Sequence, residues 1–270
     1  KRVQLFSPSL VYVRTIGTTD ESYWQPVYNH FNAPAGVAIG PDGSIHVLEG
    51  RGHRLLKFDA AGELQWEFGQ AGKGGRNDSQ LFFPEDVDVD ADGTVIVADG
   101  DNRVKLISKD GDFEANLSTG FGSGPTQFDY PTGVAFGPDG RIYVADQNNH
   151  RVQIFNKNHV HIGELGFTNQ PGNDNIHFRR PRDVDVDESG RLYVVDYGNQ
   201  RVQVFSPGLA YLRTIGVTGE CGSDHGHLCN PIAVSADSLG RVFVADSWGW
   251  RVQVFDALGR YLTTIGRREG

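Results

Sequence analysis

Short runs of apolar, often β-branched residues alternate along this chain with polar, glycine-rich segments. The runs Ile142–Asp146 and Arg151–Phe155 are typical, because turn residues flank them and valine, isoleucine and aromatic residues dominate them. Asp, Asn and Gly supply the turns, as in Pro138–Gly140. No helical pattern of 10–15 residues separates these runs, so the pattern predicts an all-β protein rather than a parallel α/β fold.

The pattern recurs five times. Each copy opens near a proline, and these prolines are 50, 47, 50 and 50 residues apart: Pro34, Pro84, Pro131, Pro181 and Pro231. An arginine keeps a similar rhythm at positions 54, 103, 151, 201 and 251. Each copy holds four strand-like runs, and four strands in about 40–50 residues is the arithmetic of a propeller blade.

Three segments that follow the second strand-like run carry a more specific resemblance. They read DQNNHRVQIF, DYGNQRVQVF and DGDNRVKL, and they begin at Asp146, Asp196 and Asp99. These segments resemble NHL repeats, and the resemblance covers nearly the whole chain. Since NHL-repeat proteins are usually six-bladed β-propellers, the resemblance implies that architecture, while the period independently predicts blades.

The number of strand-like runs predicts five complete four-stranded blades and an N-terminal half-blade. The segment Arg2–Gly17 resembles only the last two runs of a unit, Arg201–Gly216. We expect a single domain over 1–270, with a half-blade at 1–17 and full repeats at 31–69, 82–118, 128–166, 178–216 and 228–266. The chain lacks methionine and starts inside a repeat, which favours an excised or incomplete chain. We expect the missing inner strands to come from upstream or from another chain, because an unpaired strand edge invites pairing.

Charge and hydropathy limit the partners. The chain has 34 acidic and 25 basic residues, for a net charge of −9 with His neutral. This balance disfavours nucleic acid, whose phosphates bind Lys and Arg through counterion release. The densest basic cluster is Arg179, Arg180 and Arg182, which is also typical of a solvated loop. No stretch approaches the ~18 consecutive apolar residues of a membrane helix.

The two cysteines lie in one Gly- and His-rich segment, Cys221–Cys229. A disulfide in an oxidising compartment, a zinc site that also uses His225 and His227, and free thiols all fit this spacing. Paired cysteines without methionine favour an exported protein, so we expect an extracellular or periplasmic location.

Strand order places the long connections between units, and the loops between the second and third runs, on one face of a propeller. Long loops on a rigid scaffold are the preferred functional elements. An acid–arginine pair such as Asp146 with Arg151 recurs in every unit, which indicates an architectural role. We therefore expect binding residues where the units differ. The candidates are exposed aromatic residues or polar groups at the channel mouth: Trp24, Glu85, Arg182, Tyr197, Trp248 and Trp250. Packing between blades is the alternative for the aromatic residues.

Carboxylates also alternate along two innermost strands, as Asp86 and Asp88 and as Asp183 and Asp185. The two-residue period of a strand puts each pair on one side. They are candidate ligands for a hard cation such as Ca²⁺, and pairing with a neighbouring arginine or with backbone N–H groups is the alternative. The sequence assigns no cofactor with confidence, and Ca²⁺ and Zn²⁺ are the candidate ions.

Catalysis finds less support than binding. The chain is distantly similar to peptide-amidating lyases, which are six-bladed zinc propellers. Their zinc-binding His residues lie largely just after the proline that opens the inner strand. Here that position holds Ala35, Glu85, Thr132, Arg182 and Ile232. There is no G-x-S-x-G elbow and no P-loop. We expect a non-catalytic scaffold that binds a protein, peptide or glycan through the long-loop face and that self-associates. A metal-dependent propeller hydrolase or lyase is the alternative, and RNA binding is less favoured.

Overall fold

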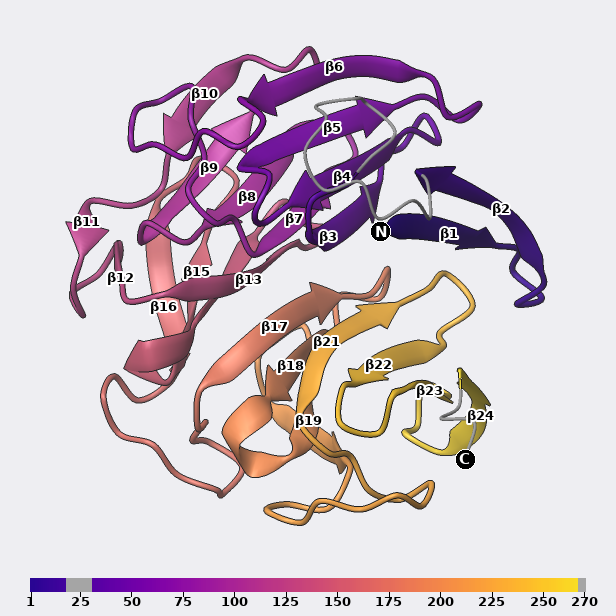
Figure 1. The fold of residues 1–270 in the computed structure, drawn as a ribbon. Helices are drawn as coiled ribbons and strands as arrows, with labels where there is room; N and C mark the ends of the chain where they lie inside the picture. The colour runs from indigo at the N-terminus through magenta and orange to yellow at the C-terminus, as the bar shows by residue number, and fades with distance from the viewer. Residues whose placement is uncertain (18–30, 267–270) are drawn as a thin grey trace. The chain divides into compact units, whose positions relative to one another are not determined.

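The computed structural model describes residues 1–17 and 31–266 (Figure 1). The chain forms two compact units, Lys1–Leu117 and Ser118–Gly270, and we describe each by itself. Strands dominate both units. The helical elements of the described residues are two short 3₁₀ turns, η1 (Gln147–Asn149) and η2 (Tyr197–Asn199). No helix in the described part of the chain is long and apolar enough to cross a membrane.

The first unit contains one two-stranded and two four-stranded antiparallel sheets. In the four-stranded sheets each strand pairs with the next along the chain. The strands are β1 (Arg2–Phe6), β2 (Tyr12–Gly17), β3 (Pro34–Ile39), β4 (Ile45–Glu49), β5 (Arg54–Phe58), β6 (Leu64–Gly69), β7 (Asp86–Val89), β8 (Val95–Asp99), β9 (Arg103–Ile107) and β10 (Phe113–Asn116).

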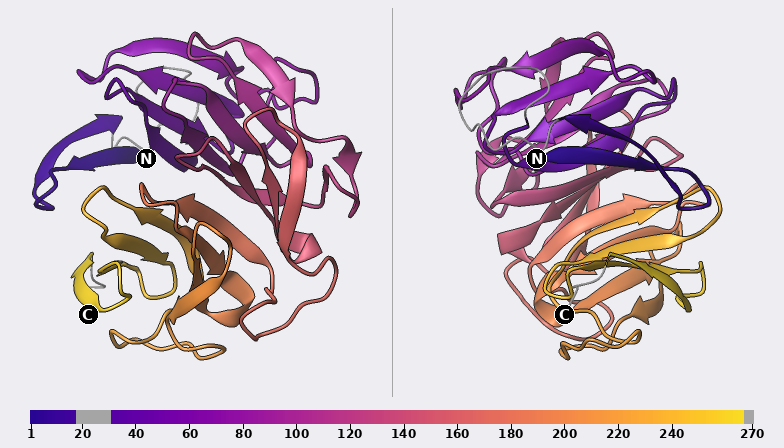
Figure 2. Two further views of the ribbon diagram at one scale, coloured as in Figure 1. Left: turned by 180° about the vertical axis from the view of Figure 1, so that it is seen from behind. Right: turned by 45° about the vertical axis from the view of Figure 1, so that its right-hand side comes forward.

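The second unit contains three more four-stranded antiparallel sheets of the same order and one short parallel pair. Its strands are β11 (Gly120–Phe121), β12 (Gln127–Phe128), β13 (Pro131–Phe136), β14 (Ile142–Asp146), β15 (Arg151–Phe155), β16 (His161–Gly166), β17 (Pro181–Val186), β18 (Leu192–Asp196), β19 (Arg201–Phe205), β20 (Tyr211–Ile215), β21 (Pro231–Ala236), β22 (Val242–Asp246), β23 (Arg251–Phe255) and β24 (Tyr261–Ile265). Within this unit the first strand of each four-stranded sheet contacts the first strand of the next, and Figure 2 shows β17 and β21 side by side.

Tight turns join the first two strands of each sheet. In the turn between β13 and β14, the N–H of Gly140 donates to the carbonyl of Gly137 at 2.9 Å. Gly140 has a φ of 77°, a left-handed conformation that glycine adopts without the steric cost of a Cβ. This explains why the Pro-Asp-Gly type of segment separates the strand-like runs of the sequence.

The apolar core lies between neighbouring sheets. Val184 of β17 packs against Ala135 and Tyr143 of the preceding sheet, and Val234 of β21 packs in the same way against Tyr193. Each such valine gains roughly 1.5–3 kcal/mol from full burial. A sheet of this kind has two apolar faces, so it is stable only beside another sheet.

Strand β3 departs from this pattern within the first unit. The side chains of Val37 and Ile39 are 53% and 61% exposed, whereas the residues equivalent to Val37 are almost fully buried: Val87 at 4%, Val184 at 2% and Val234 at 6%. The strands β1 and β2 form a separate two-stranded sheet, in which Arg2 pairs with Gly17 and Leu5 with Arg14. The half-blade expected at residues 1–17 is therefore confirmed as a strand pair.

Candidate binding surface

A buried ion pair joins the second and third strands of each four-stranded sheet. In the sheet of β13–β16, Nε of Arg151 lies 2.8 Å from a carboxylate oxygen of Asp146, and both side chains are buried. An equivalent ion pair recurs at 2.7–2.8 Å in the other four sheets, through Nε in the pairs Arg54–Glu49, Arg201–Asp196 and Arg251–Asp246, and through Nη2 in the pair Arg103–Asp99. Burial raises the pKa of the Asp146 carboxyl, and the Arg151 guanidinium opposes that shift.

Each of these arginines in the second unit also binds the backbone of the long connection that precedes its own sheet. Arg151 donates to the carbonyls of Gly124 and Gln127 at 2.9 and 3.0 Å. Two strand positions further on, Nε2 of Gln153 donates to the carbonyl of Gln127 at 2.6 Å. Arg201 and Gln203 do the same for the carbonyl of His177 at 3.3 and 3.0 Å. We call this arrangement the carbonyl clamp, and its repetition in the sheets shows an architectural role.

A second repeated contact fastens one sheet to the next on the same side. Nδ1 of His53 accepts the backbone N–H of Phe83 at 3.0 Å, and Nδ1 of His150 accepts that of Arg180 at 3.0 Å. In the following sheet, Oε1 of Gln200 accepts the N–H of Asn230 at 2.6 Å. We call these contacts the latches. Burial lowers the pKa of His53 and of His150, which favours the neutral imidazole that the latch requires.

Both partners of each latch adopt left-handed backbone conformations. In the latch between His150 and Arg180, φ is 60° at His150 and 56° at Arg180. Non-glycine residues rarely adopt positive φ, so the surrounding hydrogen bonds must hold them there. Arg180 directly precedes Pro181, and the same positive φ recurs before the other opening prolines, at Ala33, Phe83, Tyr130 and Asn230.

In the sheet of β21–β24, the loop between β22 and β23 lacks the polar side chains that fix the equivalent loops of the two preceding sheets. Where the sister loops place Asn149 and Asn199, this loop has Gly249. The two asparagines donate to the carbonyls of Gly122 and Gly172 at 2.8 and 2.7 Å. Trp250 stands at the latch position. The loop between β22 and β23 therefore lacks both polar anchors of its sister loops.

This loop presents two indoles. Trp248 is 71% exposed and Trp250 is 68% exposed, and we call them the tryptophan patch. The backbone of the loop stays ordered, because the N–H of Trp248 donates to the carbonyl of Cys229 at 3.1 Å and that of Trp250 to Ser247 at 3.3 Å. Their exposure does not fit packing between blades, which was the alternative for these residues.

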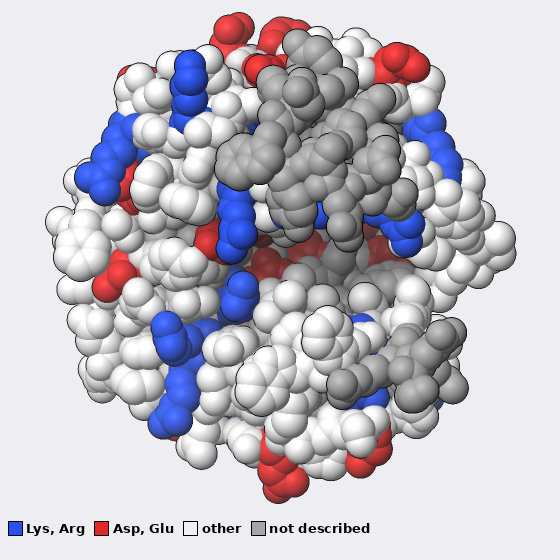
Figure 3. Space-filling model, viewed as in Figure 1, with Lys and Arg blue, Asp and Glu red and all other residues white. Residues whose placement is uncertain are grey.

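Tyr197 and Arg182, two other predicted binding residues, lie together. The guanidinium of Arg182 lies over the Tyr197 ring, 5.7 Å from its centroid. Both residues are half-buried, and Arg179 and Arg180 beside them are exposed. Figure 3 shows basic side chains gathered over the start of β17. The Tyr197 ring is therefore partly covered, and the free polar surface here is cationic.

The remaining predicted binding residues are Trp24 and Glu85. Trp24 lies outside the described residues. Glu85 lies in the first unit, just before β7, where its N–H donates to the carbonyl of Ala98 at 2.9 Å and its side chain is half-buried.

The innermost-strand carboxylates contact backbone. Oδ2 of Asp183 accepts the N–H of Val234 at 2.7 Å, and Oδ2 of Asp185 accepts that of Ala236 at 2.6 Å. Burial, with a smaller contribution from the charge of Asp187, raises the pKa of Asp185 to about 6. In the part of the chain that the structure describes, no group of three or more His, Cys, Asp or Glu residues is arranged to hold a metal ion. The candidates Asp183 and Asp185 thus fasten β17 to β21, and Asp88 accepts the N–H of Val89 at 2.8 Å.

Cys221 and Cys229 form a disulfide, as one of the three interpretations of their spacing predicted. Their thiols are consequently not available to a metal. His225 stacks on Tyr261 with ring centroids 4.0 Å apart. Nδ1 of His227 lies 2.7 Å from Asp224, which raises the pKa of that imidazole.

Three segments of the chain, residues 128–155, 178–205 and 228–255, match the family described as NHL repeat. These three segments are NHL repeats. Each match covers the first three strands of one sheet in the second unit, from a few residues before the opening proline to the end of the third strand.

Curated relatives agree with this assignment. The chain is 34% identical over 111 residues to "NHL repeat-containing protein 3" of Homo sapiens, and the match covers 39% of this chain and 32% of that protein. It is 32% identical over 131 residues to "Protein brain tumor" of Drosophila melanogaster, covering 47% of this chain and 12% of that protein. A third relative, "Peptidyl-glycine alpha-amidating monooxygenase A" of Xenopus laevis, is 33% identical over 135 residues, 47% of this chain and 14% of that protein. The chain thus spans no more than about a third of the length of these relatives.

Solved structures with the same fold cover most of the chain. "Crystal structure of Nidogen/Laminin Complex" matches with a TM-score of 0.66 at 18% identity, over 90% of this chain and 83% of that chain. "Streptogramin B lyase structure" matches with a TM-score of 0.64 at 12% identity, over 91% and 72%. The described residues of the chain therefore have an all-β propeller fold with five four-stranded blades and a half-blade, as the repeat period predicted.

Sequence reasoning missed the latches, because it assigned no role to His53, His150 or Gln200. The signal was present when the five units are laid over one another, because all three residues directly precede the repeated arginine. The role of this position is to accept a hydrogen bond from the next sheet, and the sequence alone does not show that contact.

Proposed function

We propose that these NHL repeats are a non-catalytic interaction scaffold that binds a protein, peptide or glycan through the tryptophan patch. The observation that carries the proposal is the exposure of two indoles in one loop whose ends are fixed by backbone hydrogen bonds and by the buried Asp246–Arg251 pair. Exposed tryptophans on a fixed backbone supply a large contact area at low entropic cost. They are also among the residues most enriched at binding hot spots.

The charge of the neighbouring surface indicates the kind of partner. Arg179 and Arg180 are exposed in the preceding sheet, beside the half-buried Arg182. A partner that meets both regions would present an apolar or sugar surface to the indoles and acidic groups to the arginines, since complementary charges steer association. The solved structures with the same fold leave the choice between binding and catalysis open, because they include both a protein complex and a lyase, and fold alone does not decide function.

The test compares two variants. Trp248→Ala/Trp250→Gln removes the patch and places at 250 the residue that Gln200 provides at the equivalent left-handed position. Leu258→Ala is the matched control, because Leu258 is also an exposed apolar residue but lies in the tight turn between β23 and β24. Affinity capture with cross-linking, followed by titration of each purified partner and by a glycan array, measures binding. Loss of about 2–4 kcal/mol per hot-spot residue is expected for the patch variant alone. Unchanged binding to every partner would remove the tryptophan patch from the proposal.

The second candidate function is a metal-dependent hydrolase or lyase. It is supported by the similarity to "Peptidyl-glycine alpha-amidating monooxygenase A". Elemental analysis of the purified protein separates the two. Stoichiometric Zn²⁺ or Ca²⁺, together with a turnover that chelation abolishes, would contradict the non-catalytic proposal.

Self-association through the half-blade is part of the same proposal. It is supported by the exposure of Val37 and Ile39 and by an edge strand, β1, that pairs with β2. Exposed strand edges pair readily with a second chain. Light scattering coupled to size exclusion should show an oligomer that Val37→Asp/Ile39→Lys reduces to a monomer, whereas the exposed turn variant Leu239→Asp leaves it intact. A monomeric parent protein would exclude self-association.

Export to an oxidising compartment is also proposed. The disulfide between Cys221 and Cys229 supports it, because disulfides persist mainly in such compartments. Fractionation of cells that express the protein, with alkylation of free thiols before lysis, tests the location and the redox state together.

A further inference from the structure

The outermost strand of three sheets carries a side chain that bridges to the next sheet. Arg14 of β2 donates to the carbonyls of Ala60 and Ala61. Trp66 of β6 donates its indole N–H to the carbonyl of Lys109 at 3.0 Å, and Arg213 of β20 donates to the carbonyl of Ala257. Each acceptor lies in the tight turn between the third and fourth strands of the following sheet.

The strand register shows that these three positions are equivalent. Trp66 pairs with Lys57, Arg213 pairs with Val204 and Arg14 pairs with Leu5, which are the fourth residues of their partner strands. In β16 the same position, opposite Ile154, is held by Gly163. The bridge from this sheet to the turn that contains Pro207 and Gly208 is therefore missing.

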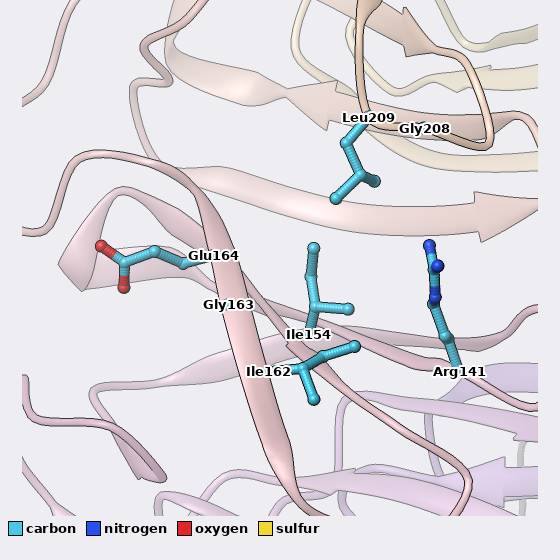
Figure 4. A pocket seen from close by; sticks show the side chains of 7 residues that line it. All are labelled: Arg141, Ile154, Ile162, Gly163, Glu164, Gly208 and Leu209. Atoms are coloured by element: carbon cyan, nitrogen blue, oxygen red, sulfur yellow. The ribbon is translucent and has the colours of Figure 1, made fainter.

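A pocket of about 230 Å³ lies where that side chain would be (Figure 4). It is lined by Ile154, Ile162, Gly163, Glu164, Gly208, Leu209 and Arg141. A Cβ built on Gly163 meets no atom within 4 Å, so the space is open from the backbone outward. Pockets that take drug-sized ligands hold about 300–1,000 Å³, and this one is of the size of a single side chain.

The walls of the pocket define the chemistry of its occupant. Figure 4 shows Ile154 and Leu209 facing each other across the space, with Ile162 beside them and Arg141 at one end. The carboxylate of Glu164 points away, toward Arg151, whose Nη1 it accepts at 2.8 Å. The interior is thus apolar, with one cation at its edge, and the Glu164 carboxylate is not directed into it.

The turn also offers an acceptor in the place where Trp66 finds one. The carbonyl of Pro207, equivalent to that of Lys109, accepts Nη1 of Arg141 at 3.2 Å, and a carbonyl oxygen has a second lone pair. The positive charge of an arginine entering the pocket would be repelled by the guanidinium of Arg141. An aromatic ring would instead be attracted to the Arg141 guanidinium through a cation–π contact.

We propose that this pocket binds a tryptophan side chain of a partner protein, in the position that Trp66 occupies between the two four-stranded sheets of the first unit. The apolar walls take the indole ring, and the indole N–H donates to the carbonyl of Pro207. Exposed Val160 and Ile162 extend the apolar rim along β16 for residues that flank the tryptophan. This site lies at the edge of the sheets that bears the turns between the third and fourth strands, opposite the edge of the tryptophan patch, so it goes beyond the proposed function.

The test uses N-acetyl-tryptophanamide as the probe in saturation-transfer NMR. The parent protein should bind it saturably in the millimolar range, and Gly163→Trp, which supplies the missing bridge from within, should weaken binding at least tenfold. Ile162→Asp is a second variant at an exposed position of the rim and should weaken binding in the same direction. Trp66→Gly opens the equivalent space in the first unit and should add a second site for the probe.

Three controls decide the assignment. N-acetyl-leucinamide and N-acetyl-argininamide should bind more weakly than the tryptophan probe, and a preference for the arginine compound would overturn the choice of tryptophan. The variant Trp248→Ala/Trp250→Gln should keep the binding of the parent, which separates this pocket from the tryptophan patch. Absence of saturable binding to the parent, or binding that survives in both Gly163→Trp and Ile162→Asp, would overturn the proposal.

Discussion

Nδ1 of His150 accepts the backbone N–H of Arg180 at 3.0 Å, and this bond joins a loop of one sheet to the residue directly before the first strand of the next sheet. The acceptor role requires that Nδ1 carry no proton. Burial, together with the charges of Arg180 and Arg179, lowers the pKa of His150, while Asp196 opposes the shift. We therefore expect the connection between these two sheets to weaken when His150 is protonated.

The first prediction concerns this latch. The folded-state pKa of His150 lies below its unfolded value of about 6.5, so the unfolded state binds more protons and stability falls as the pH drops below about 6.5. His150→Gln keeps an acceptor, as Gln200 does in the next sheet, and removes the proton. Urea unfolding at pH 7.5 and 5.5 should show a smaller loss of stability in the variant than in the parent. An equal loss in both would show that the latch does not titrate.

A buried imidazole in the first unit gives a second prediction. His46 is almost fully buried, and neither ring nitrogen has a hydrogen-bond partner in the described structure. The equivalent positions hold apolar or aromatic residues: Ile96, Tyr143, Tyr193 and Phe243. Burial lowers the pKa of His46 to about 4. At pH 5 His46 is therefore protonated in the unfolded state but largely neutral in the folded state, which lowers the free energy of unfolding by about 2 kcal/mol relative to pH 7.5.

His46→Phe should therefore raise the free energy of unfolding at pH 7.5 and raise it further at pH 5. Removing an unsatisfied buried polar group supplies the gain at the higher pH. Urea denaturation of both proteins at the two pH values measures the difference. A gain that is the same at pH 5 and pH 7.5 would contradict the titration of His46.

The carbonyl clamp leads to a third prediction. Arg151→Met leaves the buried Asp146 carboxylate without its cation and releases the carbonyls of Gly124 and Gln127. Breaking a buried pair in this way costs about 3–5 kcal/mol. The double variant Asp146→Asn/Arg151→Met should lose less, because no uncompensated charge remains. A chemical-denaturation cycle measures the coupling, and a double variant as unstable as the single one would indicate that the lost carbonyl contacts dominate.

The fourth prediction concerns the disulfide. Cys221 and Cys229 are eight positions apart, and closing a loop of this length stabilises a fold by about 2–3 kcal/mol in the chain-entropy description. Cys221→Ser/Cys229→Ser should lose this amount and become insensitive to reductant, whereas the parent should fall to the same stability when reduced. A parent whose unfolding midpoint is unchanged by dithiothreitol would contradict the prediction. The hydrogen bonds from Arg251 and Gln253 to the carbonyls of this segment would then be enough to hold it.

The features that repeat in the sequence were predicted most fully. Strand positions, tight turns and the Asp146–Arg151 type of pair follow from residue types and their spacing, because each depends on contacts within one sheet. The half-blade followed from the likeness of Arg2–Gly17 to Arg201–Gly216. The tryptophan patch was found as a departure from the repeat, at Trp248 and Trp250.

Contacts between sheets were predicted less fully. Pairing of Asp183 and Asp185 with backbone N–H groups was named as an alternative to a cation site, and that alternative agrees with the structure. The latch of His150 needs left-handed backbone at two residues 30 positions apart, and neither His nor Arg indicates such a conformation by its type. The pocket at Gly163 exists because a bridging side chain is absent, whereas a glycine within a strand more often marks a bulge or the close approach of another backbone. The carboxylates of Asp183 and Asp185 could be placed on one side of a strand, but the backbone N–H groups that they accept belong to a strand about 50 positions later.

The carbonyl clamp has a consequence for how this protein tolerates change. Arg151 and Gln153 hold the preceding connection by its main-chain oxygens, so these bonds do not depend on which side chains the connection carries. We therefore expect many side chains of that connection to tolerate substitution while its backbone keeps the same course. Selection or protein design could then change the residues that contact a partner without changing the sheet that holds the loop.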